Sequence, residues 1–466
     1  MPEKTSSQRR LDSKAGDLLR QLGVVSATAL VISNMVGTGI FTTTGFLAGD
    51  LGSPFLVLVI WLVGAVIALA GAFCYSELGI NFPASGGQYV YLTRAYGPTW
   101  GFIDGWVSFF AGFSAPIATA ALAFSAYLTY FFPALSEENA FLKLGSGEYV
   151  LRFGGAQLAA SGLILLFTVL NFFGVARIAK IQNALTALKL IVILAFIALG
   201  FFAGTGNWDH FSQPAVRTST ASLPAQFAIS LFWIYLAYSG WNAATYVAEE
   251  LRRPERTLPI ALTLGTICVT VIYALLNLVF IYAVPLEEMK GVLAVGSLAA
   301  RKLFGAETAG IFSALMALSL MATVNAMVTI GPRVYYAMAK NGAFFQVAAR
   351  VHPKWRTPVA AIAAQGVFAS ILTITPFPSL VLYIGFVLTA FAALSVTSLF
   401  RFRSRPGWQK LSVVSFAWPL VPMVFLLPAA WTIIYGVTLK PVISTAGAAT
   451  VIAGALVYHF FLRRRG

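Results

Sequence analysis

Two glycines interrupt an apolar stretch near the start of the chain, and residues of these types favour a binding site made of backbone atoms. The stretch spans residues 24–48, and its centre, residues 33–41, reads SNMVGTGIF. Glycine is a poor helix former, so we expect the helix to unwind there. At about 1.5 Å per residue, the break lies about 20 Å from one end of the stretch and about 17 Å from the other. It therefore falls near the middle of a membrane-length segment.

An unwound segment exposes N–H groups at the end of one half-helix and C=O groups at the end of the other. The N–H groups suit a carboxylate and the C=O groups suit an ammonium, so together they fit a zwitterion such as an amino acid. The alternative is that Gly37 and Gly39 only permit close helix packing; we expect them to serve binding rather than folding. The residues expected in this part of the site are Met35, Val36, Gly37, Thr38, Gly39 and Ile40.

A second stretch repeats this pattern. Residues 235–242 read YLAYSGWN, which is again interrupted by glycine and polar near the middle of an apolar segment, 224–248. Paired broken helices in two halves of a chain are typical of the binding site of a secondary transporter. The residues expected here are Leu236, Ala237, Tyr238, Ser239, Gly240 and Asn242.

Lys189 is interpreted as the only Lys or Arg inside a predicted span, about 14 Å along the helix from Lys180. A charge at that depth is costly and usually functional. An ammonium there can hold the carbonyls exposed at the first break, as a bound sodium ion does elsewhere. The alternative is a lysine that snorkels to the interface; the apolar sequence continues for thirteen residues on the other side, which disfavours it.

The composition indicates how these residues are positioned. The chain is 59% hydrophobic and 10% charged, whereas soluble domains are about 25% charged. We therefore expect an all-α polytopic membrane protein. Its twelve predicted spans are 24–48, 54–80, 98–132, 156–174, 181–203, 224–248, 258–283, 309–338, 358–376, 379–400, 412–437 and 441–462.

The net charge is +15, and the distribution of the positive residues indicates how the chain is oriented in the membrane. With Arg333 counted in the loop after the eighth span, 23 of the 31 Lys and Arg residues lie on the side of the two termini, and seven lie on the other side. Positive loops face the cytoplasm. We therefore expect cytoplasmic tails at 1–23 and 463–466, no cleavable signal peptide, a location in the cell membrane, and no nucleic-acid partner.

Several kinds of chemistry are disfavoured. Cys74 and Cys268 lie in predicted spans and are interpreted as core residues, and the three histidines have no metal-ligand spacing. No nucleophile–base arrangement is visible, so we expect no enzyme, metal or cofactor. No Asp or Glu lies at a predicted midplane, which argues against cationic substrates.

The other acidic residues are expected in salt bridges at the membrane interface. Glu249 and Glu250 precede three arginines, and this reading is favoured over a proton relay; Glu77 and Asp104 are interpreted in the same way. Residues 133–155, 204–223 and 284–308 are expected to form simple capping loops. The loop that begins at residues 82–89 is expected to lead into an interfacial helix with Tyr89, Tyr91 and Tyr96.

These motifs resemble those of a known family. Residues 36–41 (VGTGIF) resemble the G-S-G-I-F signature of the amino acid–polyamine–organocation superfamily of transporters, and residues 82–91 resemble its first cytoplasmic loop. Residues 238–242, with Glu249, Glu250 and residues 254–259, are similar to the L-type amino acid transporter branch. The resemblance implies a LeuT-type fold: an inverted repeat of five plus five helices, 24–203 and 224–400, with helices one and six broken and two helices added at 412–462. It also implies sodium-independent transport, often by exchange, with substrate between spans one and six.

By this resemblance, Gly37, Thr38 and Gly39 would bind the substrate carboxylate, and carbonyls near Met35, Leu236 and Ala237 its ammonium. Lys189 matches the lysine that the branch keeps at the former sodium position. Leu236 stands where relatives often carry an aromatic gate. The loop after span three lacks the cysteine that links a heavy chain in animal relatives, so a stand-alone, bacterial-type protein is expected.

We therefore expect a secondary transporter of neutral L-amino acids that works by alternating access, as an exchanger. Small substrates are favoured because span three offers Ala111, Gly112, Ser114 and Ala115 and because Thr38 adds a methyl group. The alternatives are proton-coupled symport, with Lys189 titrating, and an ion or solute channel, for which no filter repeat is found.

Overall fold

The computed structural model describes residues 20, 22–84, 86–145, 150–173, 175–340 and 342–462, without the side chains of 175–181 and 183. Nine helices of this described chain are long and apolar enough to cross a membrane, and one bent pair makes a tenth. The two other predicted spans correspond to shorter helices, Leu223–Tyr238 and Val359–Leu372. The prediction of an all-α polytopic protein is confirmed. The predicted tails fall largely outside the described residues.

The first half of the chain supplies the first broken span and its partners. Its elements are α2 (Val24–Met35), α3 (Thr38–Leu51), α4 (Pro54–Asn81), α5 (Gln88–Tyr96), α6 (Pro98–Val107), the π-helix η1 (Ser108–Ser114), α7 (Ala115–Leu128), η2 (Pro133–Leu135), η3 (Glu137–Asn139), β1 (Ala140–Leu144), β2 (Leu151–Gly154), α8 (Gly155–Phe172) and α9 (Val175–Phe202).

The second half of the chain contains the second interrupted span. Its elements are η5 (Trp208–Ser212), α10 (Leu223–Tyr238), η6 (Ala243–Glu250), α11 (Pro254–Ala283), α12 (Leu286–Met289), α13 (Val295–Phe304), α14 (Ala306–Lys340), η7 (Gln346–Ala349), α15 (Val359–Leu372), α16 (Phe377–Phe402), α17 (Ser412–Phe416), α18 (Leu420–Leu439), α19 (Pro441–Val457) and η8 (Tyr458–Leu462).

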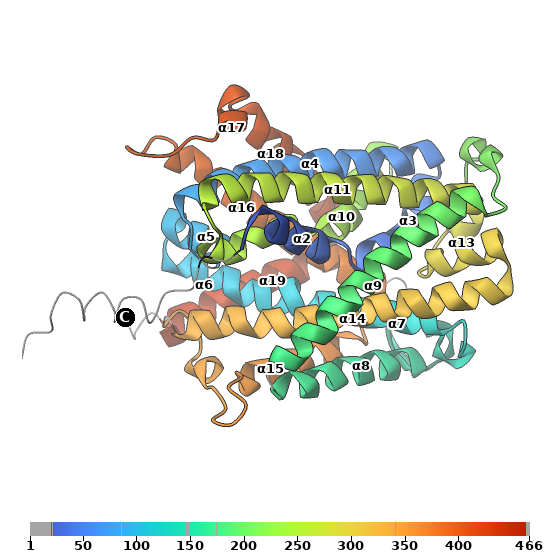
Figure 1. Ribbon diagram of the computed structural model, residues 1–466, viewed down its shortest axis with the longest axis horizontal. Coiled ribbons are helices and arrows are strands. Elements are labelled where there is room, and N and C mark those ends of the chain that lie inside the picture. Colours follow the sequence, from blue (N-terminus) through green and yellow to red (C-terminus); the bar gives the residue numbers. More distant parts are fainter. Residues whose placement is uncertain are drawn as a thin grey trace, which may run out of the picture.

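The broken spans lie in the middle of the bundle. Figure 1 shows α2, α3 and α10 between a layer that contains α4 and α11 and a layer that contains α7, α8 and α14, while α9 crosses in front of them. Helix α11 packs on both α4 and α2, and α14 packs on α7 and α9. The irregular backbone is therefore enclosed by other helices, as it must be at membrane depth.

Both breaks occur where the sequence predicts them. Helix α2 ends at Met35, Val36 is extended, Gly37 is non-helical with φ −148° and ψ −148°, and α3 leaves at 42° from α2. Helix α10 ends at Tyr238, and Gly240 has φ +97°, a left-handed conformation that favours glycine. The segment after the second break differs from the prediction, because η6 is a 3₁₀-helix rather than an α-helix, with a kink at Val247.

Two predicted capping loops are more structured than expected. Between α7 and α8, β1 and β2 form an antiparallel hairpin, and the segment after α11 contains the helices α12 and α13. The third, 204–223, contains only the short 3₁₀-helix η5. The predicted helix with three tyrosines is present as α5, and Tyr91 of this helix is fully buried.

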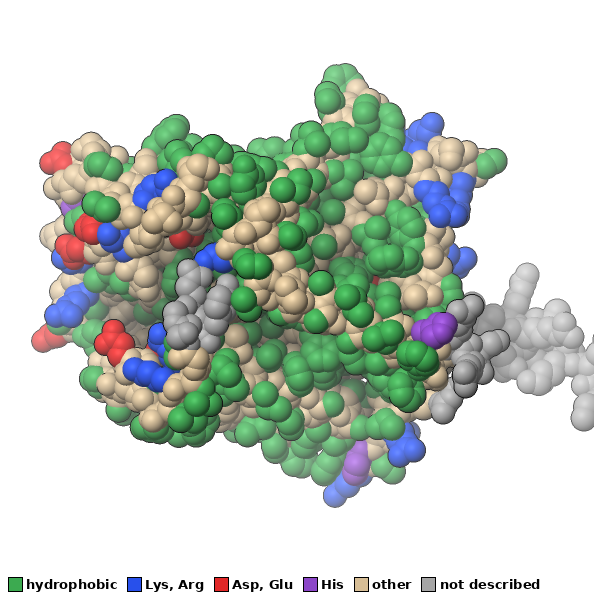
Figure 2. All heavy atoms as spheres, turned by 180° about the vertical axis from the view of Figure 1, so that it is seen from behind, with side chains coloured by type: hydrophobic (Ala, Val, Ile, Leu, Met, Phe, Trp, Pro, Cys, Tyr) green, Lys and Arg blue, Asp and Glu red, His purple; other side chains and the backbone are tan. Residues whose placement is uncertain are grey.

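Charged side chains gather at the two ends of the bundle. In Figure 2 the end on the right carries mainly Lys and Arg, and the opposite end carries side chains of both charges.

Two predictions of residue position are wrong. Arg333 lies inside α14, so Lys189 is not the only Lys or Arg within a span. Cys268 is exposed on α11, so only Cys74 is a core residue.

Candidate functional site

Lys189 binds the backbone at the first break. Its side chain is buried, and Nζ donates to the carbonyl oxygens of Ser33, at 3.3 Å, and of Val36. These two carbonyls belong to the last turn of α2, whose C=O groups have no partner within the helix. The ammonium therefore neutralises the negative end of the half-helix, and the alternative of a lysine that snorkels to the interface is wrong.

A tyrosine joins the two breaks from the neighbouring helix. Tyr273 of α11 is fully buried, and its hydroxyl lies 2.7 Å from the Met35 carbonyl oxygen and 3.0 Å from that of Ala237. One hydroxyl proton serves both acceptors, and each carbonyl keeps a second lone pair. The ends of α2 and α10 are thus held at a fixed separation.

The first turn of α3 presents unused donors. Among the described residues, the backbone N–H groups of Thr38, Gly39 and Ile40 have no hydrogen-bond acceptor outside their own helix. They lie at the positive end of the α3 dipole, which favours an anion. A carboxylate placed there would be bound by main-chain donors alone.

Glycine lets the two interrupted spans touch. A Cβ atom on Gly39 would lie 2.3 Å from the Cα of Ala237, and one on Gly240 would lie 2.8 Å from the carbonyl carbon of Asn34. A Cβ on Gly37 would have only ordinary van der Waals contacts, the shortest of them to the Thr323 methyl at 3.5 Å. The expectation that Gly39 serves binding rather than folding is therefore wrong as stated, because Gly39 is also needed for packing.

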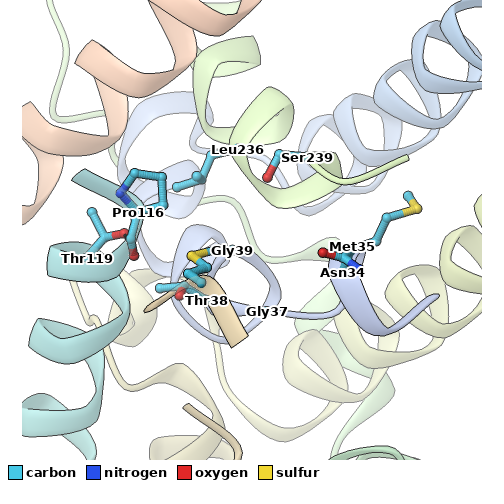
Figure 3. Close-up of a pocket in the computed structure, with 10 residues that line it drawn as sticks. Asn34, Met35, Gly37, Thr38, Gly39, Pro116, Thr119, Leu236 and Ser239 are labelled. Atoms are coloured by element: carbon cyan, nitrogen blue, oxygen red, sulfur yellow. Dashed lines mark hydrogen bonds between the residues drawn. The ribbon is translucent and has the colours of Figure 1, made fainter. Parts of the chain in front are cut away.

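A small cavity of about 20 Å³ lies at the first break, between α3, α7 and α10 (Figure 3). That volume holds about one water molecule. Its wall contains amide, hydroxyl and apolar groups. The lining residues are Asn34, Met35, Gly37, Thr38, Gly39, Pro116, Thr119, Leu236, Ser239 and Met327.

The comparison with known proteins decides what kind of protein carries this cavity. The family described as amino acid permease matches residues 22–458. The chain belongs to this family. It is an amino acid transporter of the superfamily that its motifs resemble, rather than an enzyme.

The sequence similarity to known transporters covers nearly the whole chain. The large neutral amino acids transporter small subunit 2 of Mus musculus is 29% identical over 461 residues, which cover 97% of this chain and 83% of that protein. The serine/threonine exchanger SteT of Bacillus subtilis (strain 168) is 29% identical over 458 residues, which cover 96% and 98%. The b(0,+)-type amino acid transporter 1 of Mus musculus is 27% identical over 474 residues, which cover 98% and 93%.

Six of the twelve residues predicted at the two breaks line the permease cavity, and the other six do not. Met35, Gly37, Thr38, Gly39, Leu236 and Ser239 form part of its wall. Val36 accepts from Lys189, Ile40 is in the core, and Asn242 precedes η6. Ala237 and Gly240 make the close contacts described above. The Tyr238 hydroxyl donates to the Trp61 carbonyl oxygen at 3.1 Å, away from the cavity.

Four lining residues were not predicted: Asn34, Pro116, Thr119 and Met327. Pro116 lacks an N–H group, so the helix before it cannot close all its ordinary bonds. That helix widens into the π-helix η1, in which the Ala115 N–H donates to the Phe110 carbonyl five residues back. The stretch expected to face the site, residues 111–115, does not line it; Pro116 and Thr119 do. A proline inside a predicted span was the available signal.

The acidic residues have different surroundings from one another. Glu77 is fully buried and forms the predicted salt bridge, with Arg403 Nε at 2.6 Å. Asp104 does not: its carboxylate accepts from the Gln88 amide at 2.6 Å, and no cation pairs with it among the described residues. Within the same described chain, Glu250 forms no ion pair with the arginines that follow it; its carbonyl accepts from the Leu22 N–H at 3.0 Å.

Proposed function

We propose that this permease is a sodium-independent secondary transporter that exchanges small neutral L-amino acids by alternating access. The observation that carries the proposal is the Lys189 ammonium on the carbonyls of Ser33 and Val36. A lysine ammonium at that position does what a co-transported sodium ion would otherwise have to do. No ion then needs to accompany the substrate.

The substrate would bind through the two ends of the first break. Its carboxylate would accept from the amides of Gly37, Thr38 and Gly39, with the next amide, that of Ile40, behind them. Its ammonium would lie at carbonyls near Met35, Leu236 and Ala237, two of which keep a free lone pair beside the Tyr273 hydroxyl. Val36, Tyr238, Ser239, Gly240 and Asn242 would shape the site around them.

Small substrates are supported by the cavity. Its volume is about 20 Å³, so even a small amino acid requires the walls to move apart. The lining residues contributed by α7, α10 and α14 include Pro116, Thr119, Leu236 and Met327, and none of the lining residues is aromatic. A relative named as a serine/threonine exchanger, similar over 98% of its length, supports both the size and the exchange.

The proposal extends to orientation and assembly. Residues 24–203 and 224–400 would form the two inverted repeats, and the Lys- and Arg-rich end, with both termini, would face the cytoplasm. The chain would work without a disulfide-linked heavy chain, since Cys74 is buried and Cys268 lies on α11, inside the predicted membrane.

The test is exchange in proteoliposomes that hold the purified protein. Labelled alanine outside should enter vesicles preloaded with serine much faster than empty vesicles, and equally well in sodium chloride and choline chloride. Uptake driven into empty vesicles by an imposed proton gradient would instead support symport. Non-saturable flux would support a channel.

A further inference from the structure

Helices α3 and α10 contact each other at three levels, beginning at the cavity. Gly39 contacts Ala237 at the cavity. Phe46 and Trp233 are stacked at the next level, with ring centroids 4.4 Å apart and planes 10° from parallel. The Ser230 hydroxyl donates to Asp50 Oδ2 at 3.1 Å at the outermost level. The numbering rises on α3 as it falls on α10, so the two helices are antiparallel.

A third ring from another helix completes the middle level. Phe377, the first residue of α16, is stacked 5.9 Å from Phe46 and 6.4 Å from Trp233. Phe377 is fully buried, and Trp233 is 4% exposed. Because Phe377 comes from neither broken span, this aromatic stack attaches the α3–α10 pair to the surrounding bundle.

The aromatic stack lies between the cavity and the α13 end of the protein. Trp233 is one helical turn, about 4.5 Å, from the cavity-lining Leu236. On α3, Phe46 lies about 10 Å beyond Gly39. The end of α3 contacts the segment that leads to α13, where the Gly291 N–H donates to the Gly45 carbonyl at 3.0 Å. A substrate that moved along α3 and α10 from that end to the cavity would meet this level.

We propose that Trp233, stacked with Phe46 and Phe377, is the gate residue that closes the substrate site toward the α13 end. The proposal rests on the proposed site, since a gate requires a site to close. Leu236 is too small to close the site alone, whereas three stacked rings exclude water over a wide area. Opening would separate Phe377 from the Phe46–Trp233 pair and leave the α3–α10 contacts intact.

A thiol in the cavity reports the gate without any substrate. In a background with Cys74→Ala and Cys268→Ser, Thr119→Cys would place the thiol on the cavity wall. Its rate of reaction with a charged, membrane-impermeant methanethiosulfonate would be measured from each side of oriented proteoliposomes. We expect Trp233→Ala to raise the rate about tenfold from the α13 side only, because loss of an aromatic stack shifts an equilibrium by about that factor.

Three variants make the result specific. Trp233→Phe keeps a stacking ring and should react like the parent. Leu236→Phe added to Trp233→Ala returns a ring one turn nearer the cavity and should lower the rate again. Trp431→Ala removes a stacked tryptophan that lies on α18, 6.2 Å from Phe227, and should change nothing. If Trp233→Ala does not yield a monodisperse protein, Phe377→Leu tests the other half of the stack.

Equal rates in the parent and in Trp233→Ala, or an equal rise from both sides, would overturn the gate. Amino acid exchange is measured separately. A one-sided rise in labelling in a protein that exchanges no amino acid would support the gate and reject only the proposed substrate.

Discussion

Gly39 lies against the backbone of Ala237, so that a Cβ atom on Gly39 would stand 2.3 Å from the Ala237 Cα. No side-chain rotation relieves this contact, because the neighbour is main chain. The two broken spans are therefore in close contact here because residue 39 has no side chain. Gly37, two residues earlier, has ordinary van der Waals space around its missing side chain, and its φ of −148° lies outside the left-handed region.

This difference separates packing from binding at the first break. We expect Gly39→Ala to lower the free energy of unfolding by about 1–3 kcal/mol, as other overpacked cores do. Gly37→Ala should leave stability nearly unchanged and weaken substrate binding, since the methyl group adds bulk to a cavity-lining position. Thermal unfolding in detergent and substrate binding to the same preparations would measure both. Equal loss of stability in the two variants would contradict the assignment.

Lys189 provides the second prediction. Removal of its ammonium leaves the carbonyls of Ser33 and Val36 without their donor, and an unsatisfied buried group costs about 1–3 kcal/mol. We expect Lys189→Ala to reach the membrane but to lose at least about tenfold in exchange rate, while exchange by the parent is indifferent to replacement of sodium by choline.

The matched control for Lys189 is Lys302→Ala. Lys302 pairs with Glu288 at 2.7 Å on the exposed surface, where both side chains are more than two-fifths exposed. Its loss should not change exchange. A strict sodium requirement in the parent would refute the role assigned to Lys189.

The third prediction concerns the stability of the protein at the C-terminal end of α4, where Glu77 lies. Both carboxylate oxygens of the buried Glu77 accept from Arg403, at 2.6 and 2.8 Å. The carboxylate also accepts from the indole of Trp408 at 2.8 Å and from the Leu411 N–H at 3.0 Å. The segment between α16 and α18 is thereby attached to α4.

We expect Glu77→Gln to cost about 3–5 kcal/mol, because it leaves the mostly buried Arg403 without its counter-charge. The control Glu288→Gln removes an exposed pair and should cost less than about 1 kcal/mol. Thermal unfolding followed by tryptophan fluorescence compares the two. Similar melting temperatures for both variants would show that the buried pair does not stabilise the protein.

The sequence predicted the parts of the site that depend on local chemistry. Gly37 and Gly240 weaken a helix wherever they occur, and Lys189 is conspicuous in apolar surroundings, so the breaks and the cation were accessible. The walls were not. In a membrane, apolar residues cover both the lipid face and the interior, so periodicity does not show that Thr119 and Met327 face inward. Asp104 was misassigned because its partner, Gln88, comes from a different helix.

The last prediction concerns substrate size. Leu236 lines the cavity opposite α7, and its side chain is 7% exposed. Leu236→Phe places a ring where Pro116 and Thr119 form the other wall, so space is lost at the end where a substrate side chain would lie. In a series of substrates from glycine to tryptophan, we expect this variant to lose the larger ones first and to keep alanine, and Leu236→Ala to gain larger ones. The measurement is competition against labelled alanine exchange. Uniform loss across the series would mean that position 236 controls the opening of the site together with Trp233, one turn away, and not the volume that a bound side chain occupies.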